Sequence, residues 1–222
     1  MLSFFKGYKY FGIGFALLCI IIMIIIYDVL NVTTPLPVYQ PAMVTEELVD
    51  SSIQYKRKYH SIADFSLINQ NGDTITQDNY EDKIYVADFF FTTCQTICPI
   101  MTDHMVEIQN AIKDDDEVML LSHSVTPEID SVAQLKRYAI KKGVIDGKWN
   151  LVTGDKKHIY ELARKSYLAV KSQGNGDAFD MIHTENFMLI DKKRQIRGFY
   201  DGTKKEDIEQ LLTDIAILKK EY

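Results

Sequence analysis

The chain has 222 residues, 46% of them hydrophobic and 25% charged, which is enough for one well-packed domain of ordinary size and an additional segment. Its 31 acidic residues outnumber its 25 basic ones, so the formal net charge is −6. Because the basic residues form no long stripe along the sequence, we expect no nucleic-acid partner.

The first predicted element is an apolar run near the N-terminus. Residues 10–27, YFGIGFALLCIIIMIIIY, carry no charge, and about 20 such residues are typical of a bilayer-spanning helix. Lys6 and Lys9 precede the run and Asp28 follows it. Because cationic flanks stay in the cytoplasm, we predict a cytoplasmic N-terminus at 1–9, a single-pass transmembrane anchor in the cell membrane, and an extracytoplasmic (periplasmic) remainder.

Two other interpretations of the apolar run stay open. A cleaved signal peptide normally has a shorter apolar region, of about 7–15 residues, followed by a small-x-small cleavage site, and this run lacks that site. Lipidation of Cys19 is disfavoured because Leu18 before it is bulky and the run continues past it. We therefore favour an uncleaved anchor in which Cys19 faces lipid or packs.

An irregular tether is predicted at 28–60, followed by one compact domain at 61–222. Pro35, Pro37 and Pro41 interrupt the tether, which has neither helical nor strand periodicity. Outside the cytoplasm the domain would meet an oxidising environment. The other two cysteines, Cys94 and Cys98, could then form a disulfide, a metal pair or a reactive dithiol.

The elements of the domain follow from periodicity and turn signals. Asn71-Gly72 predicts the turn of an opening hairpin. The remaining predicted elements, in order, are a buried strand at 83–91, a helix at 99–112, a buried strand at 117–125, a helix at 128–142, a short strand in 149–154, a helix at 155–166, a hairpin turning at Lys192-Lys193 and a C-terminal amphipathic helix at 204–220.

This order predicts an α/β fold with a central, mainly parallel sheet between helices. The antiparallel hairpin near the end is typical of a thioredoxin-like fold. In that fold, the turn between a buried strand and the following helix carries the redox or metal site. The pair Cys94 and Cys98 lies in that turn.

The spacing of Cys94 and Cys98 permits more than one chemistry. In a helix-like turn, residues i and i+4 share a face and lie about 6 Å apart, which suits a disulfide or two thiolate ligands on one soft metal ion. If a helix begins at Pro99, Cys98 is its N-cap and its thiolate is stabilised there. A purely structural disulfide closing so short a loop would add little stability, and no second cysteine pair completes a zinc site.

A third ligand is sought among five histidines. His183 is the best candidate, because it lies in a loop that leads directly into the strand of the last hairpin, and His123, at the end of a buried strand, is the second choice. His60, in the tether, His104, six residues past Cys98, and His158, on a helix surface, are less favoured. Two thiolates and one imidazole suit Cu(I), and such a set also holds Cu(II).

With these residues in view, the sequence resembles the Sco (SenC) family, membrane-tethered thioredoxin-like proteins that assist copper insertion into cytochrome c oxidase. The stretch FFFTTCQTICPIM (89–101) resembles the family's signature of an aromatic-rich strand followed by T-x-C-x-x-x-C-P, and DMIHTENFMLID (180–191) resembles its histidine segment. Similar blocks are IADFSLINQNGDTIT, SVTPEIDSVAQLKRYA and WNLVTGDKKHIYELARKSY, so the likeness covers about residues 60–218.

The resemblance implies roles for particular residues. It makes Cys94, Cys98 and His183 the copper ligands of a metallochaperone that is not expected to be an enzyme, and it implies the copper site of cytochrome c oxidase subunit II as the partner. Two departures stand out: Thr126 replaces an aspartate that is common before the proline, which leaves the role of that position in doubt, and Thr184 replaces a commoner serine.

Two rival functions use the same cysteines. A thiol–disulfide oxidoreductase that keeps a partner's copper-site cysteines reduced would need Cys94 and Cys98 but not His183. A peroxide-scavenging or redox-sensing domain would need an arginine beside the reactive cysteine, and none lies near Cys94 in the sequence. We favour the membrane-anchored, extracytoplasmic copper-binding assembly factor, and we keep the thiol–disulfide oxidoreductase as the alternative.

Overall fold

The computed structural model describes residues 8–30, 34–44, 49–50, 52–170, 182 and 184–222. Within the first helix it leaves undescribed the side chains at both ends and at position 25. The chain divides into two compact units, Met1–Pro35 and Leu36–Tyr222.

The first unit contains one helix, α1 (Lys9–Leu30), of 22 residues. Its described apolar side chains, from Phe11 to Ile26, are mostly exposed. Among the described residues, no helix combines the length and the apolar character needed to cross a bilayer.

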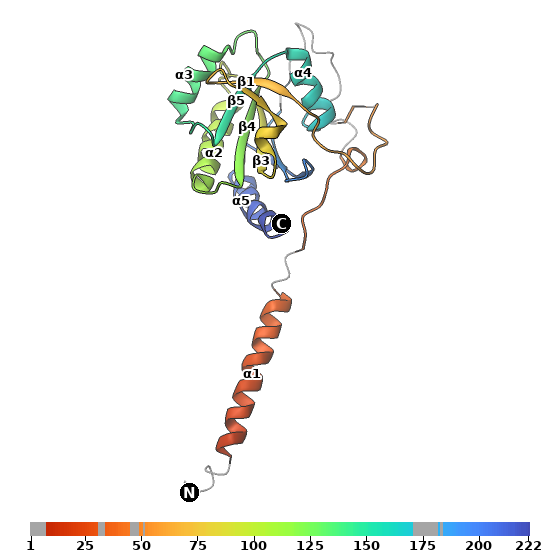
Figure 1. The fold of residues 1–222 in the computed structure, drawn as a ribbon, viewed down its shortest axis with the longest axis vertical. Helices are drawn as coiled ribbons and strands as arrows, with labels where there is room; N and C mark the ends of the chain where they lie inside the picture. The colour runs from red at the N-terminus through yellow and green to blue at the C-terminus, as the bar shows by residue number, and fades with distance from the viewer. Residues whose placement is uncertain (1–7, 31–33, 45–48, 51, 171–181, 183) are drawn as a thin grey trace. The chain divides into compact units, whose positions relative to one another are not determined.

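The second unit is built on one seven-stranded mixed sheet (Figure 1). In space the strands run β2-β1-β5-β4-β3-β6-β7, with β3, β4 and β5 mutually parallel and the other neighbours antiparallel. The strands are β1 (Ser66–Asn69), β2 (Thr74–Thr76), β3 (Ile84–Phe90), β4 (Val118–Ser124), β5 (Trp149–Thr153), β6 (Asn186–Ile190) and β7 (Ile196–Asp201).

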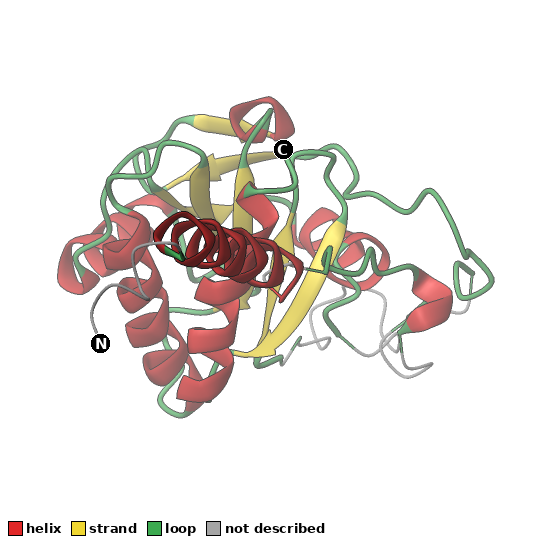
Figure 2. Ribbon diagram, turned by 90° about the horizontal axis from the view of Figure 1, so that it is seen from below, coloured by secondary structure: helices red, strands yellow, loops and turns green. Residues whose placement is uncertain are grey.

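Helices cover both faces of this sheet (Figure 2). The α-helices are α2 (Ile97–Ile112), α3 (Val132–Lys142), α4 (Lys156–Glu161) and α5 (Lys205–Lys219). A π-helix, Leu162–Ser166, continues α4, and 3-10 turns occupy Pro41–Met43 and Gln77–Tyr80. This arrangement confirms the predicted thioredoxin-like α/β fold with helices on both faces of the sheet. The prediction of a mainly parallel sheet is wrong, because only β3–β4 and β4–β5 are parallel pairs and the sheet is mixed.

The hydrophobic core is divided into two clusters, one on each face of the sheet. Successive side chains of a strand point to opposite faces, so Val86 and Phe90 join one cluster with α2, α3 and α5, whereas Ala87 and Phe89 join another with α4 and the π-helix. We call these the α2-side core and the α4-side core. All seven residues of β3 are buried, because helices cover both faces of the strand.

The predicted elements differ from the observed ones mainly at helix starts. The strands β3 and β4 are each one residue shorter at both ends than predicted, and the turn at Asn71-Gly72 is confirmed, with Gly72 at φ 85°. The helix predicted from 128 begins at Val132, because the Ser131 side chain accepts a hydrogen bond from the N–H of Gln134 and caps it. Ile129, which lies within the range predicted for this helix, precedes its observed start and is 55% exposed.

The start of the second unit is fastened to the sheet by a buried ionic cluster. The Arg197 guanidinium on β7 donates to the carbonyl oxygens of Leu36 and Pro37 and pairs with the carboxylates of Asp191 and Glu221. The Glu221 carboxylate also accepts the N–H of Leu36, at 2.8 Å. The segment that follows the first unit is thus held along the last strand and the C-terminus.

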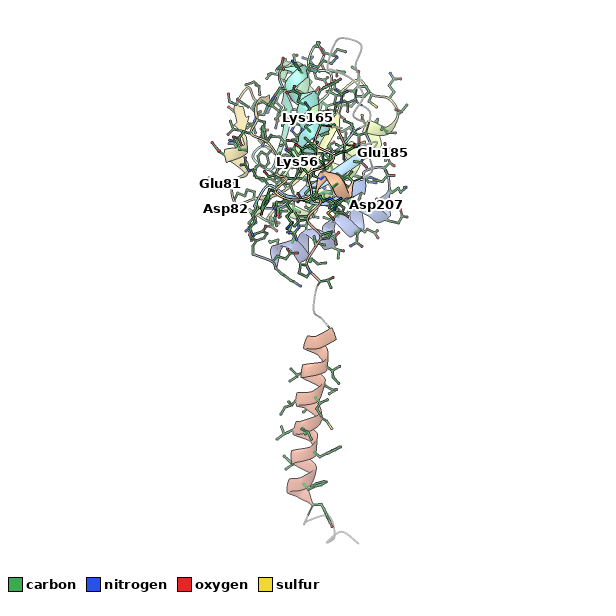
Figure 3. The ribbon with its side chains drawn as sticks, turned by 90° about the vertical axis from the view of Figure 1, so that its right-hand side faces the viewer. Lys56, Glu81, Asp82, Lys165, Glu185 and Asp207 are labelled. Carbon is green, nitrogen blue, oxygen red and sulfur yellow. The ribbon has the colours of Figure 1, made fainter. Side chains whose placement is uncertain are left out.

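Charged side chains of both signs lie on the second unit. Figure 3 labels acidic side chains at two sides of the unit, Glu81 with Asp82 and Glu185 with Asp207, and shows Lys56 and Lys165 between them in that view.

Candidate metal centre

The two cysteines of the domain lie where β3 ends and α2 begins. The turn that follows β3 is closed by a hydrogen bond from the N–H of Cys94 to the carbonyl of Phe91, at 3.3 Å. The cap residue of α2 is Thr96, and both cysteines are free thiols. Cys94 is half-buried and Cys98 is 4% exposed, so the two sulfurs have different surroundings although they lie one helical turn apart.

The prediction that Cys98 is the N-cap residue with a lowered pKa is wrong. The helix begins at Ile97, two residues earlier than Pro99 predicted, so Cys98 lies in the first turn and its side chain packs in the α2-side core. Burial raises the pKa of Cys98 to about 12, and its hydrogen bond to Cys94 and the charges of Cys94 and Asp88 add to the rise.

Cys94 instead occupies the position that favours a thiolate. Its Sγ accepts the backbone N–H of Cys98 at 3.4 Å and lies 3.6 Å from the Thr96 hydroxyl. Burial alone would raise the pKa of Cys94, but hydrogen bonds with the Cys98 thiol, with Thr96 and with the Cys98 backbone outweigh it and lower the pKa to about 7. Free N–H groups at a helix N-terminus stabilise an anion in this way.

A buried carboxyl group lies behind the cysteines. Asp88 on β3 is 3% exposed, and its Oδ1 has no hydrogen-bond partner among the described residues. Burial raises the pKa of Asp88 to about 7, an effect that a hydrogen bond with the Ser122 side chain offsets only in part. The composition and motifs did not single out Asp88, because a lone aspartate in an apolar strand carries no signal of its own.

A second buried carboxylate, Asp130, holds the loop that carries Cys94. It accepts the hydroxyls of Thr92, Ser124 and Thr126. The sequence marked position 126 only as a departure from the family pattern, and the structure shows that the Thr126 hydroxyl donates to Asp130 at 3.0 Å. Asp130 lies in the block SVTPEIDSVAQLKRYA, which resembles the family, but no role could be assigned to it from the sequence.

The second-choice ligand, His123, is not brought to the cysteines. Its ring is fully buried, stacks on Phe89 with centroids 4.8 Å apart and meets Tyr167 edge-on, all on the α4-side of the sheet. Cys98 packs on the opposite face. Burial lowers the pKa of His123 to about 4, so the ring is a neutral core side chain at physiological pH.

The other histidines have separate partners or positions. The ring of His104 contacts the carbonyl of Gly202 at 2.7 Å, that of His60 contacts the carbonyl of Ser166 at 2.7 Å, and His158 lies in α4. The preferred ligand, His183, lies outside the described residues. Within the described part of the chain, no three His, Cys, Asp or Glu side chains are grouped to hold a metal ion.

The segment that leads into β6 lies at the same end of the sheet as the cysteines. The antiparallel register pairs Ala87 with Met188, so the residues before Asn186 lie beside those that follow β3. Thr184 is 6% exposed, and its hydroxyl donates to the carbonyl of Ala169 at 2.8 Å.

The pair of sulfurs fits a soft metal ion. One sulfur is partly exposed and favours the thiolate form, and the other lies one helical turn away and shares a hydrogen bond with it. A metal ion can replace the shared proton, because thiolates are the ligands that Cu(I) prefers. The same pair could equally act as nucleophile and resolving thiol in disulfide exchange.

A family model described as SCO1/SenC matches residues 53–219. A curated relative, the SCO1 protein homolog of Bacillus subtilis (strain 168), is 30% identical over 158 residues, which are 70% of this chain and 81% of the relative.

Solved structures of the same family are also similar. A SCO1/SenC family lipoprotein from Bacillus anthracis str. Ames is 30% identical, with a TM-score of 0.64 over 72% of this chain and 95% of that one. A second similar structure is that of BsSco, which is 29% identical, with a TM-score of 0.61 over 72% of this chain and 93% of that one. BsSco is described as having a disulfide switch and as a member of the Sco family of cytochrome c oxidase assembly proteins. Arabidopsis thaliana ScoI with copper bound is 26% identical, with a TM-score of 0.58 over 72% and 98%.

Proposed function

The chain belongs to the SCO1/SenC family, and from that membership we propose that it is a copper-binding protein that takes part in the assembly of cytochrome c oxidase. The observation that carries the proposal is the Cys94–Cys98 pair, a partly exposed thiolate position beside a buried thiol at the start of α2. Relatives described as binding copper and as assembling the oxidase support it.

Cys94, Cys98 and His183 are the proposed copper ligands. Cys94 is the first to bind, because it is the more exposed sulfur and the better thiolate. Binding then displaces the proton of Cys98, since a ligating thiol must be deprotonated. The strand register supports His183 as the third ligand, because Thr184, the next residue in the chain, lies at the end of the sheet where Cys94 lies.

Copper is the cargo in this proposal, and its transfer is a ligand exchange. A partner with its own thiolates and imidazoles attacks the metal, and the bonds to Cys94, Cys98 and His183 break one at a time. The proposed recipient is the copper site of cytochrome c oxidase subunit II. Both Cu(I) and Cu(II) are compatible with the ligand set.

Membrane attachment is part of the proposal. The sequence supports it, because the run 10–27 carries no charge and follows Lys6 and Lys9. A related protein is described as a lipoprotein, which supports a membrane-attached domain outside the cytoplasm. A phosphatase that is active only outside the cytoplasm, fused after Tyr222, should be active in membrane fractions, and an inactive fusion would contradict this placement.

A thiol–disulfide oxidoreductase is the second candidate. It is favoured by one observation, the contrast between a low-pKa Cys94 and a high-pKa Cys98, which suits attack by the first sulfur and resolution by the second. Reduction of a partner's disulfide would leave Cys94 and Cys98 joined, and an external thiol reductant would have to reduce them again.

Titration of the reduced, full-length protein in detergent with Cu(I), against a chromogenic chelator, tests copper binding. We expect one copper ion per chain, lost in Cys94→Ser and in Cys98→Ser. Cys19→Ser is the matched control, because it removes the third cysteine of the chain and should bind copper as the wild type does. Unchanged affinity in Cys94→Ser would contradict the proposed site.

A further inference from the structure

A fully buried carboxylate joins the cysteine loop to the neighbouring strand and helix. Asp130 has no exposed surface. Its Oδ1 accepts the Thr92 hydroxyl at 2.5 Å, and its Oδ2 accepts the Ser124 hydroxyl at 2.6 Å, the Thr126 hydroxyl at 3.0 Å and the Thr92 N–H at 3.2 Å. These donors come from the loop after β3, the end of β4 and the segment before α3.

Thr92 supplies two of the four hydrogen bonds that the Asp130 carboxylate accepts. Its backbone N–H and its hydroxyl both donate to the Asp130 carboxylate, and its hydroxyl also accepts the side-chain amide of Gln134 at 3.0 Å. Both the backbone and the side chain of this residue are therefore fixed. Thr92 lies two residues before Cys94, inside the turn that the Cys94 N–H closes on Phe91.

The strength of this anchor follows from its burial and charge. A buried carboxylate needs several donors to offset its loss of hydration, and hydrogen bonds to an ionised acceptor are roughly twice as strong as neutral ones. Four donors satisfy Asp130, so moving any one of them leaves a buried charge short of a partner. The cysteine loop is thus tied to a buried group that is costly to disturb.

We propose that Asp130 is a positioning residue for the metal centre. The hydrogen bonds that the structure describes for its side chain reach neither cysteine sulfur. It acts through Thr92, whose fixed backbone keeps the Cys94 sulfur over the first turn of α2 within reach of Cys98. The part of the inference that concerns copper binding rests on the proposed function. The part that concerns the relative position of the two sulfurs does not, because that position also governs disulfide formation without metal.

Four variants separate positioning from stability. Thr92→Val removes the hydroxyl and keeps the N–H, Thr92→Ser restores the hydroxyl, and Asp130→Asn removes the charge. Thr126→Val is the matched control, because it removes a hydroxyl donor from the same carboxylate at a position outside the cysteine loop. If Asp130→Asn fails to fold, the Thr92→Val and Thr92→Ser pair still decides the question.

The first readout is metal-free: the equilibrium constant for forming the Cys94–Cys98 disulfide in a glutathione redox buffer. A loosened loop makes the two sulfurs meet less often, so Thr92→Val and Asp130→Asn should lower this constant about tenfold, which is about 30 mV in potential. Thr92→Ser and Thr126→Val should stay within about twofold of the wild type. Equal constants in Thr92→Val and Thr126→Val would overturn the proposal.

The second readout is the rate at which Cu(I) leaves the protein for a chelator. Mutating residues that orient metal ligands typically changes metal affinity 10–100-fold. Thr92→Val should therefore release copper about tenfold faster than Thr126→Val, when the two variants are compared at the same interval below their own melting temperatures. A wild-type protein that takes up no copper would refute the proposed function and leave the disulfide readout as the test of Asp130. Equal release rates would overturn the positioning role.

Discussion

At the scale of single residues, two cysteines four positions apart have opposite acid–base behaviour. The pKa of Cys94 is lowered to about 7 by hydrogen bonds at the start of α2, and burial raises that of Cys98 to about 12. The difference arises because one sulfur faces the free N–H groups of the first turn and the other packs in the core. Cys94 is therefore the reactive thiol of the pair.

Alkylation of the reduced, metal-free protein should show this difference. Only the thiolate reacts, so the iodoacetamide rate at Cys94 should rise with a midpoint near pH 7, whereas Cys98 should react slowly up to pH 9. Peptide mass spectrometry after timed quenching gives the two rates separately. Equal rates with a common midpoint near the ordinary thiol value of about 8.5 would contradict the described geometry.

Asp88 should make the stability of the domain depend on pH. Burial raises the pKa of Asp88 to about 7 from 3.8, so the folded state holds a proton that the unfolded state has lost. The free energy of unfolding should therefore fall as pH rises from about 4 to 7. The three-unit difference sets an upper bound of about 4 kcal/mol on this loss.

Urea unfolding of Asp88→Asn tests this dependence, because an amide has no charge to bury. We expect the variant to gain on the order of 2 kcal/mol relative to the wild type at pH 8 and little at pH 4.5. Asp116→Asn, at an exposed position, is the control and should show no such gain. A gain that is the same at both pH values would count against a buried, titrating Asp88.

The sequence singled out Cys94 and Cys98 as a pair, but it did not predict which of the two has the lowered pKa. Pro99 suggested a helix start, yet proline is tolerated throughout a first turn, where N–H groups have no intrahelical partner. The helix could therefore begin at Ile97 and carry Cys98 into the core. Asp130 was missed as an anchor because its donors, Thr92 and Ser124, are distant in sequence and show no shared pattern.

At the scale of elements, the buried cluster around Arg197 connects β7 to both ends of the second unit. The Arg197 side chain is 5% exposed and that of its partner Asp191 is fully buried. Removing one member of a buried ion pair typically costs 3–5 kcal/mol, because the other charge stays buried without its partner. Arg197→Met should therefore lower the free energy of unfolding by about 3 kcal/mol.

Arg194→Met provides the comparison for that variant. Arg194 pairs with Asp64, but their side chains are 42% and 74% exposed, and such surface pairs contribute at most about 1 kcal/mol. Both variants are measured by urea unfolding at one pH. Equal losses in the two variants would show that the Arg197 cluster does not hold the element ends together.

Central strands were easier to predict than helix starts. The strands β3 and β4 consist of apolar runs between polar residues, so their limits are visible in the sequence within one residue. The start of α3 was placed too early, because Ile129 fits the apolar period of the helix although Ser131 is the residue that caps it. A capping hydrogen bond is a local geometry that periodicity does not encode.

At the scale of the whole molecule, the alternation of strands and helices predicted the thioredoxin-like fold but not the pairing of the outer strands, which is antiparallel. The sheet in turn explains why distant segments meet: the parallel pair β3 and β4 ends beside the segment that enters the antiparallel strand β6. The cysteine loop, Asp130 and Thr184 thus lie at one end of the sheet. The functional residues could be proposed from this topology and the motifs together, and from neither one separately.

The measurement that tests the central claim most directly compares His183→Ala with the wild type for oxidase assembly under limiting copper. Copper delivery needs two thiolates and an imidazole, whereas disulfide exchange needs only Cys94 and Cys98. We predict that His183→Ala loses most copper retention and oxidase assembly while its dithiol still cycles with a small-molecule oxidant, and that Cys94→Ser loses both activities. Normal oxidase assembly by His183→Ala would contradict copper delivery and favour the reductase.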